Sequence, residues 1–228
     1  MLTVFASIVV WFRAIYIDMV TDIYDTTGFV KLVALHSLCT DIFTGLPPRL
    51  KATGAFTATN AIRMVGIRTI TADGALNLGM LEEFHASSEL PNSAQPLELG
   101  DVLLSIRGSL PKCAPVEEAF SQNTFASGNL AVLRPDSTQL DSSYLWSVLL
   151  RICHDEHHPL LTRATTQQLS IRISELSAVR IPQPSLDEQR AVGRAALALR
   201  NAVRTQRDAL IQGERTMRAF LADSFPIQ

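Results

Sequence analysis

The sequence predicts an α+β fold, in which a globular body of mixed β-sheet and short helices is followed by one long C-terminal helix of the coiled-coil type. Two observations support this class. Short stretches typical of strands and of short helices are interleaved up to residue 184, and residues 185–222 contain no proline and keep one apolar repeat. We therefore divide the chain into an apolar N-terminal segment at 1–27, a body at 28–184, the long helix at 185–222 and a tail at 223–228.

The long helix follows a proline-rich approach. Pro182 and Pro184 hold the backbone extended, which disfavours helix before Ser185. Ser185 and Glu188 have the spacing of a capping box, in which each side chain accepts from the backbone amide of the other residue. Asp187 adds negative charge at the positive end of the helix dipole. These signals predict that the helix starts at Ser185.

Apolar residues of this helix recur at alternating intervals of four and three residues, which is the 3.5-residue period of a coiled coil. Two positions are weak, because Gln206 is polar and Gly213 costs about 1 kcal/mol relative to alanine. No other stretch predicts a helix of comparable length, so we expect the packing partner on a second chain. We name nine positions the seam: Val192, Ala196, Leu199, Val203, Gln206, Leu210, Gly213, Met217 and Phe220.

The first part of the body combines one strand signal with loops. A short strand or helix is predicted at Gly28–Leu38, and the glycine and two prolines within Thr44–Pro48 predict a turn or loop. Small polar residues at Thr53–Asn60 predict a loop. Ala61–Ile70 alternates with a period of two and therefore predicts a strand, with Arg63 on one of its faces.

The second part of the body contains the most apolar strand. Val102–Ile106 is apolar on both faces, which predicts a buried strand, and Gly108 ends it. The other predicted elements are a strand at Leu130–Leu133, a helix at Ser143–Ile152, a polar loop at Thr162–Gln168, a turn at Ser174–Leu176 and an extended run at Ala178–Ile181.

Charge and cysteine content narrow the class of protein. The net charge of -2 gives no global electrostatic argument for binding nucleic acid. The charge is uneven, however, because residues 28–76 carry five Lys and Arg against two Asp, a local excess of +3. The three cysteines, Cys39, Cys113 and Cys153, are isolated in sequence, which argues against a disulfide framework and is typical of a reducing cytoplasm.

The apolar residues at the N-terminus leave three interpretations open. A membrane-spanning helix needs about 20 uninterrupted apolar residues, and Arg13 and Asp18 interrupt this run. An export signal needs positive charge before the apolar stretch and a small-residue cleavage site, and neither is clear here. We therefore favour a core or interface element over a membrane or export segment, with a leader outside the main domain as the third interpretation.

Motifs for catalysis and cofactor binding are missing from the sequence. It contains no phosphate-binding glycine loop, nucleophile elbow or metalloprotease motif. His154 and His158 are four residues apart and could share a helix face as metal ligands. The other interpretation, which we prefer, is a solvated helix end before Pro159. We expect no metal site, no bound cofactor and no catalytic activity in this chain.

Polar loops instead carry side chains of the kind that contact phosphates and base edges. Each of them alone is more simply a solvated surface residue. Arg107 is the exception, because it ends a buried strand beside Gly108; its alternative role is an ion pair with Asp101 or another acid. The candidate DNA-binding residues are Arg49, Lys51, Asn60, Arg63, Arg68, Arg107, Ser109, Lys112, Asn123, Arg163, Thr165, Thr166, Gln167 and Gln168.

Three motifs together resemble the DNA specificity subunit of type I restriction–modification systems. Gly100–Ser109 is similar to that family's Gly-Asp strand, which ends in Arg-Gly. Leu130–Pro135 is similar to a later strand, and Ile181–Val192 is similar to the start of its long helix. Each motif is loose, but their order and spacing are specific, and the resemblance covers about residues 28–222.

The resemblance implies a target-recognition domain at 28–184 that binds double-stranded DNA and a dimerisation and spacer helix at 185–222. Subunits of this family usually hold two such domains and two antiparallel helices, so this chain looks like a half subunit that forms a homodimer through the seam. It would direct a methyltransferase subunit, and a restriction subunit where one exists, to a split target. S-adenosylmethionine and ATP would be bound by those partners.

Two further interpretations stay open beside the resemblance. The low net charge and the apolar N-terminus fit an assembly protein of the same fold that no longer reads DNA. A membrane-attached form is a more distant third interpretation, which rests on residues 1–20 alone.

Overall fold

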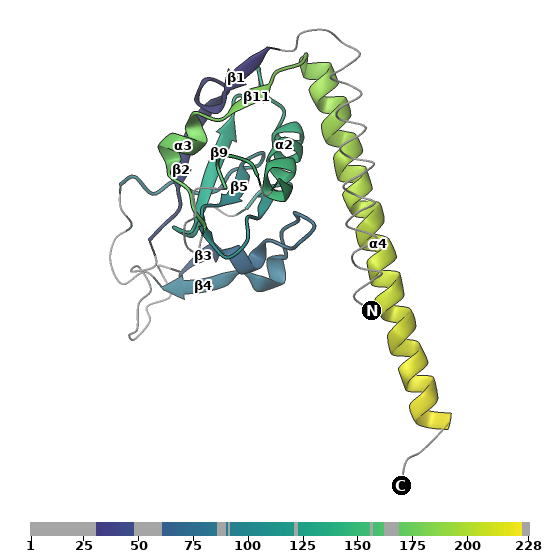
Figure 1. Cartoon of the computed structure of the whole chain (residues 1–228). Coiled ribbons are helices and arrows are strands. Elements are labelled where there is room, and N and C mark those ends of the chain that lie inside the picture. Colours follow the sequence, from purple (N-terminus) through teal and green to yellow (C-terminus); the bar gives the residue numbers. More distant parts are fainter. Residues whose placement is uncertain are drawn as a thin grey trace.

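The structure, a computed structural model, describes residues 31–47, 61–85, 90, 92–120, 123–155, 157–161 and 169–224. These residues form an α+β body followed by one long helix, α4, which runs alongside the body and extends beyond it (Figure 1). The predicted fold class is therefore confirmed. The N-terminal segment at 1–27 and the predicted loops at 53–60 and 162–168 lie outside the described residues, and the expectations for them stay predictions.

A four-stranded antiparallel sheet in the order β2-β9-β5-β7 forms the centre of the body. All residues of β5 are buried, because β5 lies between two other strands and contributes side chains to an apolar cluster on each face of the sheet. The predicted strands at Val102–Ile106 and Leu130–Leu133 are confirmed, with small differences at their ends. The strands are β2 Cys39–Thr44, β5 Val102–Ser105, β7 Cys113–Pro115 and β9 Leu130–Pro135.

A second sheet of three strands, β4-β3-β8, lies beside the first and continues its apolar core. β3 spans Ala61–Val65 and pairs antiparallel with β4, Glu82–His85, and parallel with β8, Thr124–Ala126. Because β3 joins strands that are far apart in sequence, it brings the loop before β8 next to the first half of the body.

The prediction of one continuous strand over Ala61–Ile70 is wrong in its second half. β3 ends at Val65, and a 3-10 helix, η4, spans Ile67–Thr69. Gly66 separates the two, and its N–H donates a hydrogen bond to Thr69 Oγ1 at 3.2 Å, which favours the tight turn over further strand pairing.

Two short ribbons join distant parts of the chain. β1, Leu32–Ala34, pairs with β11, Arg180–Pro182, so the start of the described body lies beside the segment that leads into α4. β6, Arg107–Gly108, pairs with β10, Leu169–Ser170. The short helix η1, Leu35–Ser37, follows β1 directly.

Helix α2, Ser142–His154, covers one face of the central sheet and packs against α4 on its other side (Figure 1). The Asp141 carboxylate caps it by accepting from the Tyr144 N–H at 3.0 Å. The predicted helix at Ser143–Ile152 is confirmed. Two shorter helices complete the body: η5, Leu78–Met80, and α3, Ile173–Ser177, the latter where a turn was expected.

Helix α4, Leu186–Ser224, starts with the predicted capping box. The Ser185 N–H donates to Glu188 Oε2 at 2.9 Å, and the Glu188 N–H donates to Ser185 Oγ at 3.4 Å. Hydrogen bonds from Ser185 lower the pKa of Glu188. With 39 residues the helix is about 58 Å long. Among the residues that the structure describes, no helix is long and apolar enough to cross a membrane.

The expectation that α4 has no packing partner in its own chain is wrong for its first half. Ala196 is buried, and Val192 packs against the same apolar cluster as α2. Helix α2, with only 13 residues, is long enough to cover this half, so the packing partner does not need the length of α4. From Gln206 onward, the seam residues are exposed in this chain.

Candidate nucleic-acid interface

The described candidate residues lie on two neighbouring parts of the body. The six residues that the structure describes are Arg63, Arg68, Arg107, Ser109, Lys112 and Asn123. The other eight candidates lie outside the described residues, and their role stays a prediction. They are Arg49, Lys51, Asn60, Arg163, Thr165, Thr166, Gln167 and Gln168.

Arg63 and Asn123 are brought together by the parallel pairing of β3 with β8. The Arg63 N–H donates to the Asn123 backbone oxygen at 2.8 Å, and both side chains are exposed. The Arg63 guanidinium lies 3.5 Å from Glu83 on β4, with both side chains largely in solvent. An exposed pair of this kind contributes little to stability, so Arg63 can exchange this partner for a phosphate.

Arg68 and Arg107 lie on adjacent elements. A Cβ placed on Gly108 would lie 3.4 Å from the Ile67 side chain, so η4 rests on β6. Arg68 follows Ile67 and Arg107 precedes Gly108, and both arginines are exposed. Exposed guanidinium groups are side chains of the kind that bind phosphates, and these two come from elements that touch.

Ser170 is a further exposed polar residue that the sequence did not reveal. It lies opposite Arg107 in the β6–β10 ribbon. The two-residue strand β10 carries no periodic signal, so only the pairing in three dimensions identifies it. Through this pairing Arg107 lies opposite a residue that follows closely, in sequence, the predicted polar loop at 162–168.

Lys112 has a structural contact in place of a free amine. Its Nζ donates to the backbone oxygen of Ile70 at 3.0 Å, and its N–H donates to Ser105 Oγ at 2.7 Å. Ser105 is fully buried, and its hydroxyl holds the backbone of the β5–β7 connection at Lys112. Ser109, by contrast, is exposed at the tip of the same connection.

The alternative ion pair between Arg107 and Asp101 is wrong. Asp101 is buried and accepts from Arg134, with Nε–Oδ1 at 2.8 Å and Nη2–Oδ2 at 2.9 Å. Arg134 also donates to Glu98 at 2.6 Å and lies 5.6 Å from the centre of the Phe43 ring. The hydrogen bond with Asp101 raises the pKa of Arg134. Arg107 is therefore not needed to neutralise Asp101.

The Asp101–Arg134 pair connects two of the motifs that carry the family resemblance. Asp101 belongs to the Gly-Asp strand, and Arg134 belongs to the later strand. In the third motif, the Gln189 amide is buried and donates to the backbone oxygens of Gln139 and Pro184 at 3.1 and 3.0 Å. The motif residues thus hold the framework of the body together.

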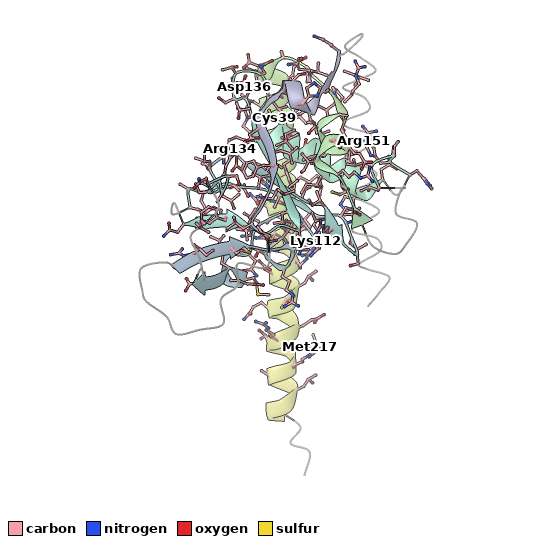
Figure 2. All side chains as sticks on the ribbon, turned by 90° about the vertical axis from the view of Figure 1, so that its left-hand side faces the viewer. Cys39, Lys112, Arg134, Asp136, Arg151 and Met217 are labelled. Atoms are coloured by element: carbon pink, nitrogen blue, oxygen red, sulfur yellow. The ribbon has the colours of Figure 1, made fainter. Side chains whose placement is uncertain are left out.

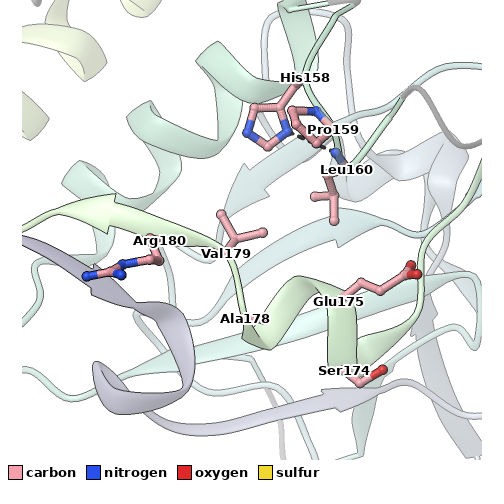
Figure 3. Close-up of a pocket in the computed structure, with 8 residues that line it drawn as sticks. All are labelled: His158, Pro159, Leu160, Ser174, Glu175, Ala178, Val179 and Arg180. Atoms are coloured by element: carbon pink, nitrogen blue, oxygen red, sulfur yellow. Dashed lines mark hydrogen bonds between the residues drawn. The ribbon is translucent and has the colours of Figure 1, made fainter.

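A pocket of about 460 Å³ lies between α3, β11 and the turn after α2 (Figure 3). His158 lines it, but its Nδ1 accepts from the Leu160 N–H at 3.2 Å, and burial lowers the pKa of the ring. Arg180 lines it as well and donates to the Leu32 oxygen at 2.8 Å. Both side chains therefore bind backbone groups of their own chain. Among the described residues that line the pocket, no nucleophile is paired with a base.

The metal interpretation of His154 and His158 does not fit the structure. Helix α2 ends at His154, and His158 lies in the following turn, so the two do not share a helix face. Within the part of the chain that the structure describes, no group of three or more metal-ligating side chains could hold an ion.

The second half of α4 exposes large apolar side chains along the seam. Leu210 is 61% exposed, Met217 65% and Phe220 67%. Met217 projects from the part of α4 that extends beyond the body (Figure 2). Large apolar side chains that are exposed along one helix face mark an interaction surface.

Comparison with known proteins places this arrangement in a known fold. No protein-family model matches the sequence, and no curated protein matches it. Solved structures match it in three dimensions. A chain from a structure that addresses complex assembly and conformational transition of the type I R-M system aligns over 91% of this chain and 49% of its own length, with 19% identity and a TM-score of 0.60.

Two isolated subunits give the same result. The HsdS subunit from Thermoanaerobacter tengcongensis aligns over 81% of this chain and 42% of its own, with 23% identity and a TM-score of 0.51. The type I restriction-modification S subunit from M. genitalium aligns over 87% and 46%, with 18% identity and a TM-score of 0.50. This chain spans about half the length of the structures that it matches, and it has the fold of type I specificity subunits.

Proposed function

We propose that the protein is a DNA-binding specificity subunit of a type I restriction–modification system, which directs a partner methyltransferase to a split target site. The observation that carries the proposal is the shared fold, which extends over the body and α4 together. The exposed Arg68 and Arg107 on adjoining elements supply the kind of side chain that such a role needs.

In this proposal the chain itself is not catalytic. The methyltransferase subunit binds S-adenosylmethionine and transfers the methyl group, and a restriction subunit, where one exists, uses ATP. The motifs that these reactions need are missing from the sequence. The complex acts on chromosomal DNA, so the proposal also implies a cytoplasmic location.

The proposal includes a homodimer that forms through α4. The exposed Leu210, Met217 and Phe220 would be covered by the same residues of a second, antiparallel copy. Such a dimer carries two bodies at opposite ends of a helix pair and therefore two half-site readers at a defined separation. This chain aligns with about half of the matched chain, so two copies in a two-fold dimer would together correspond to its full length.

Selection of DNA by the complex of this chain with its methyltransferase tests the proposal. From a library of random duplexes, the complex is expected to enrich a bipartite sequence with a defined spacer. Binding of the enriched duplex should fall steeply with salt, because phosphate contacts release counterions. No enrichment over scrambled competitor DNA would favour an assembly protein that keeps the fold without reading DNA.

Substitution of Arg107 separates DNA contact from folding. Arg107→Ala removes an exposed side chain, so unfolding by urea should not change. Affinity for the selected duplex is expected to fall by about fivefold or more, since a contact to a base or phosphate is worth about 1–3 kcal/mol. The matched control is Arg151→Ala on α2, an exposed arginine on another element, which should leave binding unchanged.

A further inference from the structure

Helix α4 contacts the body through a face that overlaps the seam at Val192 and Ala196 but is centred to one side of it. Besides Ala196, the residues buried on this face include Gln189, Gly193 and Arg200, none of which is apolar. At 3.6 residues per turn, these buried residues are centred about 70° around the helix from Leu210 and about 90° from Met217. One helix therefore carries two contact faces, one toward its own body and one that is exposed beyond it.

Arg200 makes the most extensive polar contact on the body-facing side. Its side chain is 3% exposed. Nη2 donates to Glu117 Oε1 at 2.9 Å and to Oε2 at 2.7 Å, and Nη1 donates to the Gly74 backbone oxygen at 3.3 Å. The guanidinium carbon lies 5.1 Å from the centre of the Trp146 ring, close enough for a cation–π contact.

The surroundings of Arg200 come from three separate parts of the body. Gly74 belongs to the turn before η5, Glu117 follows β7, and Trp146 lies in α2. Gly74 has a φ of 75°, and a Cβ there would lie 2.8 Å from Trp146 Nε1, so only glycine lets this turn approach the indole. Two helical turns further along α4, Arg207 Nη1 lies 3.8 Å from Asp73 Oδ1. The turn is thus shaped to receive an arginine from α4.

The geometry makes the direction of α4 sensitive to this contact. From Arg200 to Ser224 the helix extends about 36 Å. A tilt of about 5° at Arg200 would displace the far end by about 3 Å, nearly the rise of one base pair, about 3.4 Å. Apolar packing alone tolerates small shifts of this size, whereas a planar guanidinium that donates to the Glu117 carboxylate and the Gly74 oxygen and lies over the Trp146 ring fixes an orientation.

We propose that Arg200 is a positioning residue, which fixes the angle between α4 and the body through Glu117, Gly74 and Trp146 and thereby sets the half-site spacing that the protein accepts. This inference rests on the proposed function for its consequence on DNA. Its structural part, the fixed angle, is independent of DNA and is tested separately.

The test compares two matched substitutions on α4 with one at Glu117, the partner of Arg200 in the body. Arg200→Met keeps a long apolar stem over Trp146 and removes the fork, and Glu117→Gln removes the partner charge at a side chain that is 42% exposed. Arg204→Met is the matched control, the same exchange one turn further at an exposed position. Urea unfolding shows whether each variant folds. If Arg200→Met does not fold, Glu117→Gln serves as the test.

The first measurement uses the complex with its methyltransferase and duplexes that keep the two selected half-sites but vary their spacing by one base pair. Preference of the wild type for its own spacing is expected to fall about tenfold in Arg200→Met, equivalent to about 1.4 kcal/mol. Glu117→Gln should weaken it in the same direction, and Arg204→Met should not. The half-site sequences should stay the same in all variants.

The second measurement needs no DNA. Spin labels on Ser137→Cys in the body and Gln212→Cys on α4, in a Cys39→Ser, Cys153→Ser background, give the distance between the two by pulsed electron paramagnetic resonance. Labelled chain is diluted into unlabelled chain so that only distances within one chain contribute. A narrow distribution in the wild type that broadens in Arg200→Met supports the proposal.

The two measurements distinguish the possible failures. An unchanged distance distribution and an unchanged spacing preference in Arg200→Met would overturn the role of Arg200. If the wild-type complex selects no bipartite DNA, the proposed function fails, and the distance distribution alone decides whether Arg200 fixes the angle. Equal broadening in Arg204→Met would also overturn it, because the effect would not belong to the buried contact.

Discussion

Gly193 of α4 lies directly against the backbone of Tyr144 in α2. A Cβ at Gly193 would lie 2.8 Å from the Tyr144 nitrogen and 2.7 Å from Ser143 Oγ, closer than real Cβ atoms approach. Glycine costs about 1 kcal/mol inside a helix, so its presence here offsets that cost by allowing the two helices to touch. The start of α2 and the first half of α4 therefore form one close-packed unit.

Gly193→Ala is expected to destabilise the protein, although alanine is the better helix former. The added methyl group would force α2 and α4 apart, and overpacking of this kind costs about 1–3 kcal/mol. Urea unfolding followed by circular dichroism measures the change. The matched control is Gly213→Ala, where no described atom lies within 4 Å of the new Cβ, and there stability should rise by about 1 kcal/mol. A gain at both positions would show that Gly193 is not in contact with α2.

The sequence predicted the existence of α4 better than its contacts. The capping box and the 3.5-residue repeat were enough to predict where the helix starts and that it is long. They did not reveal that Gln189, Gly193 and Arg200 face the body, because a polar residue or a glycine on a helix is ordinarily interpreted as a solvated or weak position. Their partners come from segments 50 to more than 100 residues away, which a local pattern does not contain.

The candidate interface shows the same limit. Lys112 is a candidate cation at a loop tip, and its amine donates to Ile70. The alternative role of Arg107 is an ion pair with Asp101, and Arg134 occupies that carboxylate. Both contacts are long-range pairings, which residue order does not fix. The neighbourhood of Arg68 and Arg107 became visible only when η4 and β6 were seen to touch.

Loss of Arg134 is expected to destabilise the body strongly. Arg134→Met would leave the Asp101 carboxylate buried without its cation, and breaking a buried pair in this way costs about 3–5 kcal/mol. Urea unfolding measures the loss. The double variant with Asp101→Asn removes the uncompensated charge and should recover part of the stability. A change below about 1 kcal/mol in Arg134→Met would place this pair among weak surface contacts.

Cys39 is expected to resist alkylation in the folded protein. Burial raises the pKa of its thiol to about 12, so at pH 8 only about one molecule in ten thousand carries the reactive thiolate. Burial also raises the pKa of Cys113. Mass spectrometry after treatment with iodoacetamide at pH 8 should find both residues unmodified in buffer and modified in urea. Raising the pH toward 12 before unfolding should increase the rate at Cys39, and equal rates in buffer and urea would contradict its burial.

Leu210→Asp is expected to give monomers while the body stays folded. Leu210 is exposed in the single chain, so the substitution should not alter unfolding of the monomer, but in the proposed dimer it buries two carboxylates. The dissociation constant should rise at least about 100-fold, equivalent to about 2.7 kcal/mol, as measured by light scattering across a dilution series.

Leu199→Asp should act in the same direction, with an additional loss of stability because Leu199 is partly buried against its own chain. The control is Ile211→Asp, a neighbouring apolar residue that is also exposed but lies about 100° around the helix, and it should leave the dimer intact. Dimers of unchanged affinity in Leu210→Asp would show that the seam is not the interface, and a wild-type protein that is monomeric at micromolar concentration would show that this face of α4 binds a different chain.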